Sequence, residues 1–397
     1  MDVQETPRRQ LSQSQKKVIT LLSKQGPLTK RQLSSLAGIG WATVVNSVDE
    51  LIEAGIVRNV GLAENPPGKR GKHAENYDLA AEYPLALGID VEYRTTHLAL
   101  VSLKGSVVAE TRVPTIQQPT HDDVVRFLSG TVREFADGLG IRMSGIAGIG
   151  IGIPGIGFPS RSPRNNLEKG RDLEATLTEV FNTRVRVHHN TKAYTLFEQW
   201  ANAETRLTDF VWVAIRTGVG TGIIHQGQLY AGSHGLAGEI GHLKVVPNGP
   251  PCRCGGTGCL ETVVNERYLF QQYTTHVLRS SSWPAGGEPQ QLHEGLQDLF
   301  NRSAEGEPQA RQVIDTAVGY LGHALAATVT VLDINTIVLS GHFGPNGDQI
   351  VEPLRHAILS EALPEVPLRV IYSPFDAQGY VQGAALLVLS DYFVDAL

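Results

Sequence analysis

The chain has 397 residues, a formal net charge of −6 and a hydrophobic fraction of 41%. This length exceeds what one hydrophobic core normally serves, so two or three domains are expected. The sequence holds no run of about 18 apolar residues and begins without a signal-peptide pattern, which excludes a membrane span and predicts a cytoplasmic location.

Charge is unevenly distributed along the chain. The segment Met1–Glu75 carries eleven Lys and Arg against seven Asp and Glu, whereas the remainder is acidic. A basic N-terminal part on an acidic body suits a small polyanion-binding module attached to a domain with another task.

Three helices are predicted in the basic part. Helical spacing of apolar residues predicts the first over Gln15–Ser23. Thr29 is the expected N-cap of the second, Lys30–Ala37. A turn at Gly38–Gly40 then precedes the third, Trp41–Ala54, which a following glycine ends.

Two helices joined by a three-residue glycine-containing turn indicate a helix-turn-helix, whose later helix enters the major groove of DNA. Short or hydrogen-bonding side chains near the start of that helix are the candidate base contacts: Trp41, Ala42, Thr43, Asn46 and Ser47. A helical protein-interaction domain with merely solvated charges is the alternative.

A basic hairpin favours DNA over that alternative. Strands predicted at Ile56–Arg58 and Asn76–Leu79 flank a loop in which Lys69, Arg70 and Lys72 would contact phosphates or reach into a minor groove. Residues 1–79 are therefore predicted to form a winged helix-turn-helix DNA-binding domain, followed by a linker over residues 80–84.

Residues 85–397 read as an α/β domain of two similar lobes. The first series of elements begins with a three-stranded meander, and the second repeats this order. The first comprises strands at Leu85–Asp90, Thr96–Val101, Val107–Thr111 and Ile146–Ile151 with a helix at Asp122–Asp137. The second comprises strands at Phe210–Ile215, Gly222–His225, Leu229–Tyr230, Thr336–Leu339 and Leu368–Tyr372, helices at Asn265–Val277 and Pro308–Val331, and an Ala-rich helix from Gly379.

A glycine pattern at Gly150–Gly155 formally matches a dinucleotide-binding fingerprint. The match lies within and after a predicted strand, and Pro154 prevents the turn that such a site requires. Dinucleotide binding is therefore not predicted.

All three cysteines of the chain lie within eight residues, at Cys252, Cys254 and Cys259, with His242 ten residues before the first. Three thiols and an imidazole are the four ligands of a closed tetrahedral zinc site, and intervening glycines allow the loop 242–259 to fold back. The alternative is a set of buried thiols, or one disulfide with a free cysteine. A closed set of four ligands predicts a structural Zn²⁺ with no catalytic role.

Three motifs resemble the ROK family of repressors and sugar kinases. They are Gly238-Glu-Ile-Gly-His242, the Cys-x-Cys-Gly-x-x-Gly-Cys-Leu-Glu run that ends at Glu261, and Gly150–Gly155. With a winged helix-turn-helix ahead of them, the chain is similar to the repressor branch. The resemblance implies an actin-like, hexokinase-type fold, a sugar ligand, and a homodimer or homotetramer on DNA.

The chain departs from the kinases of this family at two places. Their phosphate loop reads Asp-x-Gly-Gly-Thr, whereas this chain has Asp90-Val-Glu92-Tyr-Arg and adds a negative charge there. Their catalytic Asp aligns with Asn190, an amide that cannot act as a general base. The glycines of Thr217–Gly222, the second phosphate segment, are retained. No catalytic residue is therefore assigned.

The sugar-binding positions of the family are retained. Glu239, His242 and Glu261 match them, and His189 and Asn190 are interpreted as further binding residues. Asn166 is a weaker match that could equally cap a turn. If His242 also binds zinc, one ring nitrogen faces the metal and the other the sugar.

These observations predict a transcriptional repressor that responds to a sugar or sugar phosphate. A dimer would bind a pseudo-palindromic operator, and sugar-dependent closure of the lobes would change the spacing of its DNA-binding domains. Two rivals remain. One is a sugar kinase that also binds DNA, and the other is a DNA-bound regulator controlled by a protein partner.

Overall fold

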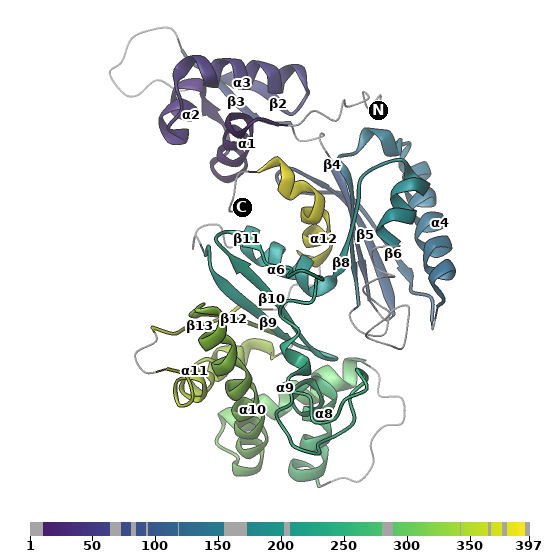
Figure 1. Cartoon of the computed structure of the whole chain (residues 1–397), viewed down its shortest axis with the longest axis vertical. Coiled ribbons are helices and arrows are strands. Elements are labelled where there is room, and N and C mark those ends of the chain that lie inside the picture. Colours follow the sequence, from purple (N-terminus) through teal and green to yellow (C-terminus); the bar gives the residue numbers. More distant parts are fainter. Residues whose placement is uncertain are drawn as a thin grey trace. The chain divides into compact units, whose positions relative to one another are not determined.

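The structure is a computed structural model, and its description covers residues 11–63, 73–80, 85–92, 94–117, 119–154, 173–201, 207–279, 289–341, 343–363, 367–374 and 379–393. The chain divides into two compact units (Figure 1). Unit 1 takes its described residues from Met1–Ser160, Arg164–Arg206 and Gln378–Leu397, and unit 2 takes most of its own from Leu207–Ala377. Within these ranges, no helix is both long and apolar enough to cross a membrane.

The N-terminal part of unit 1 is a winged helix-turn-helix. Its helices are α1 (Gln13–Gln25), α2 (Lys30–Ala37) and α3 (Trp41–Glu53). A small antiparallel sheet of order β1-β3-β2 completes it, from β1 (Leu28–Thr29), β2 (Val57–Leu62) and β3 (Glu75–Leu79). We call this part the head. Its strands β2 and β3 form the predicted hairpin, and the basic tip with Lys69, Arg70 and Lys72 lies outside the described residues, as does most of the linker.

Local sequence sets the ends of the head's helices. Thr29 caps α2, as predicted, through a reciprocal pair of hydrogen bonds with Gln32. Ser12 and Gln15 form the same arrangement at α1, so this helix begins two residues before its predicted start. Gly38, in the left-handed conformation, ends α2 and permits the turn into α3.

The rest of unit 1 is an α/β structure built on a five-stranded sheet of order β6-β5-β4-β7-β8. Its strands are β4 (Leu85–Val91), β5 (Thr95–Ser102), β6 (Val107–Pro114), β7 (Gly148–Ile153) and β8 (Val185–His189). The meander β4–β6 was predicted. Strand β7 begins and ends two residues later than predicted, and β8 was not among the predicted elements.

Helices cover both faces of this sheet. On one face, apolar residues of α4 (His121–Leu139) and of the helical residues 173–181 share a core with β4 and β7. On the other face lie α12 (Gly379–Leu389) and its neighbour α6 (Asn190–Ala201), as Figure 1 shows.

Glycines explain how closely α12 approaches the sheet. A Cβ on Gly150 of β7 would lie 1.8 Å from the carbonyl oxygen of Ala384, and one on Gly88 of β4 would lie 2.1 Å from that of Val381. Gly150 therefore lies within a strand and allows the close approach of α12. Sequence order had grouped α12 with the second lobe, and this placement was wrong because its small residues fit the glycine face of unit 1.

Unit 2 contains a second five-stranded sheet, of order β11-β10-β9-β12-β13. Its strands are β9 (Phe210–Ile215), β10 (Val219–His225), β11 (Gln228–Leu229), β12 (Thr336–Gly341) and β13 (Arg369–Tyr372). One large apolar core joins the sheet to α7 (Glu261–Val264), α8 (Glu266–Gln272), α9 (Pro289–Ala304), α10 (Pro308–Leu332) and α11 (Val351–Leu359).

Most elements of unit 2 were predicted, with several differences, among them that β10 begins at Val219, three residues before its predicted start. The predicted helix Asn265–Val277 is α8 followed by a π-helical turn at Tyr273–Val277. Helices α7, α9 and α11 were not among the predicted elements, although Pro289 at the start of α9 and Gly306 shortly after its end are signals that identify a helix in sequence. The repeat of an antiparallel meander extended by parallel strands is present in both units.

Candidate functional site

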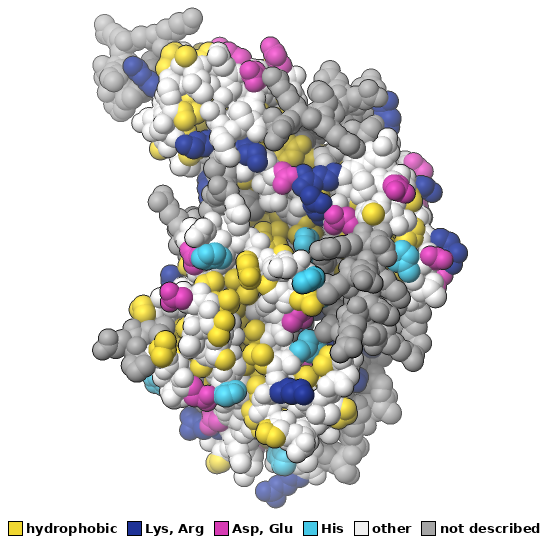
Figure 2. Space-filling model, viewed as in Figure 1, with side chains coloured by type: hydrophobic (Ala, Val, Ile, Leu, Met, Phe, Trp, Pro, Cys, Tyr) yellow, Lys and Arg dark blue, Asp and Glu magenta, His cyan; other side chains and the backbone are white. Residues whose placement is uncertain are grey.

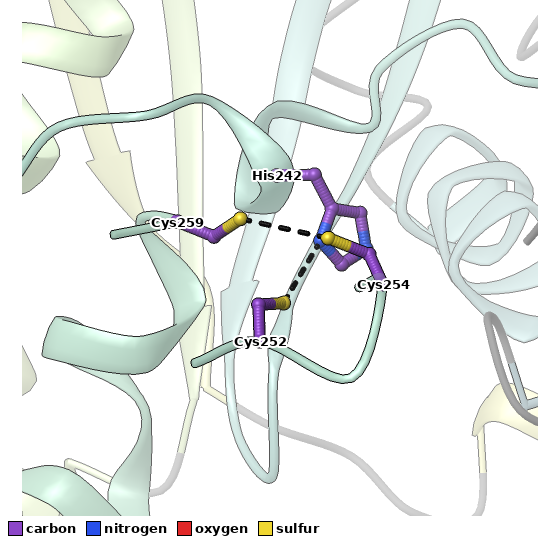
Figure 3. A group of neighbouring side chains, drawn as sticks. All are labelled: His242, Cys252, Cys254 and Cys259. Carbon is purple, nitrogen blue, oxygen red and sulfur yellow. Dashed lines mark hydrogen bonds between the residues drawn. The ribbon is translucent and has the colours of Figure 1, made fainter. Parts of the chain in front are cut away.

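The three cysteines and His242 come together in unit 2. Their ligand atoms all lie within 4.8 Å of one another (Figure 3). Cys254 Sγ is 3.6 Å from Cys259 Sγ, and Cys252 Sγ is 3.5 Å from Nδ1 of the imidazole. No sulfur pair is joined as a disulfide, since all three cysteines are free.

Backbone geometry brings the four side chains to one centre. His242 ends a short 3-10 turn, Ile240–His242, after β11. The cysteine loop folds back through two glycines with positive φ, Gly255 at 88° and Gly258 at 68°. A Cβ on Gly258 would lie 1.8 Å from the carbonyl oxygen of Val246, so no other residue fits there.

This donor set fits a tetrahedral metal ion. Thiolates bound to zinc at about 2.3 Å are separated from one another by roughly 3.8 Å, close to the spacing of Cys254 and Cys259. Burial raises the pKa of the Cys252 and Cys259 thiols. Burial also opposes ionisation of Cys254, but a hydrogen bond from the Gly256 N–H and contacts with the other thiols lower its pKa. Cys252 and Cys259, whose pKa values are raised, would bind a metal ion as thiolates, so the cation would have to promote the loss of their protons.

Two predicted sugar-binding carboxylates flank the same imidazole. Glu239 Oε2 lies 3.9 Å from His242 Nε2, and Glu261 Oε1 lies 3.7 Å from Nδ1. Nδ1 therefore faces the sulfurs and Nε2 faces Glu239, an arrangement in which the two ring nitrogens can serve different partners.

Glu261 is fixed by neighbours that sequence reasoning missed. It is 5% exposed, its Oε1 accepts a hydrogen bond from Cys252 Sγ at 3.1 Å, and its Oε2 pairs with Arg253 at 3.2 Å. A Cβ on Gly218 would lie within 3 Å of both this carboxylate and the guanidinium. The position of Arg253 inside the cysteine motif was the available signal for its role.

The predicted binding residues of unit 1 lie where β8 passes into α6. His189 is the last residue of β8, and Asn190 is the first of α6. Both are partly exposed, while burial lowers the pKa of the adjacent His188. Asn166 lies outside the described residues.

Asp90, at the altered phosphate loop, faces inward. It is 5% exposed. The Tyr194 hydroxyl donates a hydrogen bond to its carboxylate and lies 2.9 Å from Oδ1 and 3.0 Å from Oδ2. Tyr194 stacks on Tyr380 of α12 with ring centroids 3.7 Å apart. No sequence signal could have paired Asp90 with Tyr194, because the two residues are 104 positions apart.

In the head, four of the five candidate base contacts are exposed at the start of α3. Trp41 is 57% exposed, and Ala42, Thr43 and Asn46 are also exposed. Ser47 is a correction. It is 5% exposed, because it follows Val44 by three residues and precedes Val48, on the buried face of the helix.

Charged side chains of both signs are interspersed over the face seen in Figure 2. Among the described residues of this face, basic side chains are not gathered into one strip.

Comparisons with known proteins place these observations in a family. A model of the ROK family matches residues 86–391. The putative xylose repressor of Caldicellulosiruptor sp. is 26% identical over 388 residues, which cover 92% of this chain and 92% of that protein. The glucokinase of Thermotoga maritima is 26% identical over 313 residues, which cover 76% of this chain and 96% of that protein.

Among solved structures, a ROK family transcriptional regulator, a homologue of the Escherichia coli MLC protein, has a TM-score of 0.73. It is 24% identical in sequence, and the match covers 96% of each chain. This likeness shows the fold over nearly the whole molecule, including the head.

Proposed function

The chain belongs to the ROK family, and we propose that within it this protein is a sugar-responsive regulator of transcription, acting as a repressor of carbohydrate-metabolism genes. The head carries this proposal. Its second and third helices are joined by the turn of a helix-turn-helix, and α3 presents exposed side chains at its start. The xylose repressor relative matches 92% of the chain, which supports the same assignment for the whole molecule.

We propose that the ligand is a sugar or sugar phosphate, with Glu239, His242 and Glu261 as its main candidate contacts and His189, Asn190 and Asn166 as further ones. Carboxylates suit sugars because each can accept more than one hydroxyl hydrogen. The four-residue cluster supports a structural Zn²⁺ that fixes the orientation of His242. The active form is a homodimer or homotetramer, in which ligand binding changes the spacing of the heads on a pseudo-palindromic operator.

The arrangement around Asp90 supports the loss of phosphotransfer. Its carboxylate accepts from a buried tyrosine, and Asn190 offers no proton acceptor where family kinases have an Asp. The competing function is a sugar kinase, which the glucokinase relatives and the glycines at Thr217–Gly222 favour. The kinase reading predicts sugar phosphate when the protein is incubated with ATP and hexoses, whereas our proposal predicts none.

A thermal-shift screen tests ligand binding directly. The panel contains D-xylose, D-glucose, N-acetyl-D-glucosamine and the 6-phosphates of the last two. A ligand at 100 times its Kd stabilises the native state by about 2.7 kcal/mol, which raises the Tm. Anisotropy of a labelled duplex, selected by the protein from a random-sequence library, then reports whether that sugar changes DNA affinity. Absence of any sugar effect, with DNA binding intact, would instead favour a protein partner as the effector.

A further inference from the structure

The turn between β5 and β6, Leu103–Gly105, touches the head. The hydroxyl of Ser23 on α1 donates to the carbonyl of Leu103 at 3.4 Å. Lys104 Nζ forms an ion pair with the carboxylate of Asp78 on β3, whose side chain is only 10% exposed. Both contacts lie within unit 1, and they hold a helix and a strand of the head to a single turn.

The same turn is held from the other side by α6 and α12. Gln382 of α12 donates its side-chain amide to the carbonyl of Gly105 at 2.7 Å. The indole of Trp200, near the end of α6, lies against Gly105 so closely that a Cβ there would be 2.1 Å from the ring. Gly105 has a φ of +74°, so both its backbone conformation and this contact require glycine.

Helix α6 joins this turn to the predicted sugar-binding residues. It begins at Asn190, and Trp200 lies about 15 Å further along its axis at 1.5 Å per residue. Gly379 and Gly383 of α12 pack directly on Phe197 and Ala193 of α6, where a Cβ would come within 2.1 Å in each case. The two helices therefore move together, because a shift of one alone would produce steric overlap.

We propose that Leu103–Gly105 is the coupling element through which ligand binding at Asn190 reaches the head. A small shift of α6 carries Trp200 against Gly105 and changes the geometry of the Lys104–Asp78 ion pair. Lys104 and Trp200 are positioning residues: they contact neither sugar nor DNA, and they fix the head in one of its ligand-dependent positions. This inference rests on the proposed function, since it assigns the regulation of that sugar site.

The test compares full-length variants in DNA binding with and without sugar. Lys104→Met removes the charge and keeps the length of the side chain, and Lys104→Arg restores the charge. Arg126→Met is the matched control. It also removes a cation of unit 1, but the ion pair of Arg126 is with Asp123 on the same helix, α4. The probes are the library-selected duplex and the panel sugar that raises the wild-type Tm most. Anisotropy gives the ratio of DNA Kd values, and calorimetry without DNA gives sugar affinity.

Lys104→Met is expected to lower the ratio of the DNA Kd values with and without sugar by about two- to fivefold, without loss of sugar binding. This range corresponds to the contribution of a partly exposed ion pair. Lys104→Arg should recover the wild-type ratio, and Arg126→Met should keep it. Trp200→Phe, which withdraws the indole from Gly105, should lower the ratio as well. A wild-type ratio in Lys104→Met, or an equal fall in Arg126→Met, overturns the coupling role while sugar regulation stands. If wild-type protein shows no sugar-dependent change, the proposed function itself is wrong and this inference falls with it.

Discussion

Gly383→Ala should destabilise unit 1, although alanine is the better helix former. At Gly383 in α12, a Cβ would lie 2.1 Å from the carbonyl oxygen of Ala193 and 3.0 Å from Cβ of Phe197. The first neighbour is a backbone atom, so α6 or α12 must shift to admit a methyl group. Overpacking of this kind costs about 1–3 kcal/mol, against a gain in helix propensity of at most about 1 kcal/mol.

With the full gain in propensity subtracted, the expected net loss is up to about 2 kcal/mol, which lowers the Tm by up to about 8 °C for a unit of this size. Gly130→Ala is the control within unit 1, because a Cβ added at Gly130 in α4 would meet nothing within 4 Å. It should raise the Tm by about 2–4 °C. Gly319→Ala, equally open in α10, should stabilise unit 2 instead.

Scanning calorimetry of the full chain measures all three variants. The two units can unfold in separate transitions, so the Gly319→Ala variant identifies the transition of unit 2. Gly130→Ala and Gly383→Ala should move the other transition in opposite directions. If Gly383→Ala stabilises as much as Gly130→Ala, the close packing of α6 on α12 is refuted.

Three further predictions concern metal, DNA and pH. Cys254→Ser should lose zinc and weaken sugar binding, measured by metal analysis and calorimetry; loss of zinc with unchanged sugar affinity would break the link between them. Trp41→Ala should weaken DNA binding about fivefold or more at unchanged Tm, since one base contact contributes about 1–3 kcal/mol; anisotropy that shows equal affinity would remove Trp41 from the interface. Burial lowers the pKa of His188, so the unfolded chain takes up a proton first as the pH falls below about 6.5. The free energy of unfolding then falls with falling pH, by up to about 1.4 kcal/mol per pH unit for this group. His188→Gln should reduce the slope of the free energy of unfolding against pH, measured by denaturant titrations at several pH values. An unchanged slope would contradict this.

Local signals predicted the elements that they directly encode. Thr29 caps α2 and Gly38 ends it, because both effects involve residues close in sequence. The cysteine cluster was predictable for the same reason, since a short glycine-containing loop carries three of its four ligands. Within α3, the error at Ser47 came from treating the first turns as wholly outward, although the spacing of Val44 and Val48 already fixes the buried face.

Long-range packing was not predictable from one sequence. Helix α12 can lie on the sheet of unit 1 because Gly88 and Gly150 have no side chains that would clash with it. Glycines in a strand do not indicate in the sequence which helix packs against them. Tyr194 was missed because its hydrogen bond to Asp90, 104 positions away, depends on how separate elements meet. Arg253 was missed although it lies in the same local motif as Glu261.

Asp90 shows why the proposed loss of phosphotransfer involves more than one replaced residue. Its carboxylate is nearly buried and accepts the Tyr194 hydroxyl, and Tyr194 is held by its stack on Tyr380. A hydrated Mg²⁺ keeps several of its waters, so it needs carboxylate oxygens that face solvent or substrate phosphates. An Asp at position 190 would restore a proton acceptor but would leave Asp90 directed into the contact between α6 and α12. The proposed loss of phosphotransfer therefore predicts that Asn190→Asp alone yields no sugar phosphate from ATP and hexoses, because Asp90 stays bonded to Tyr194.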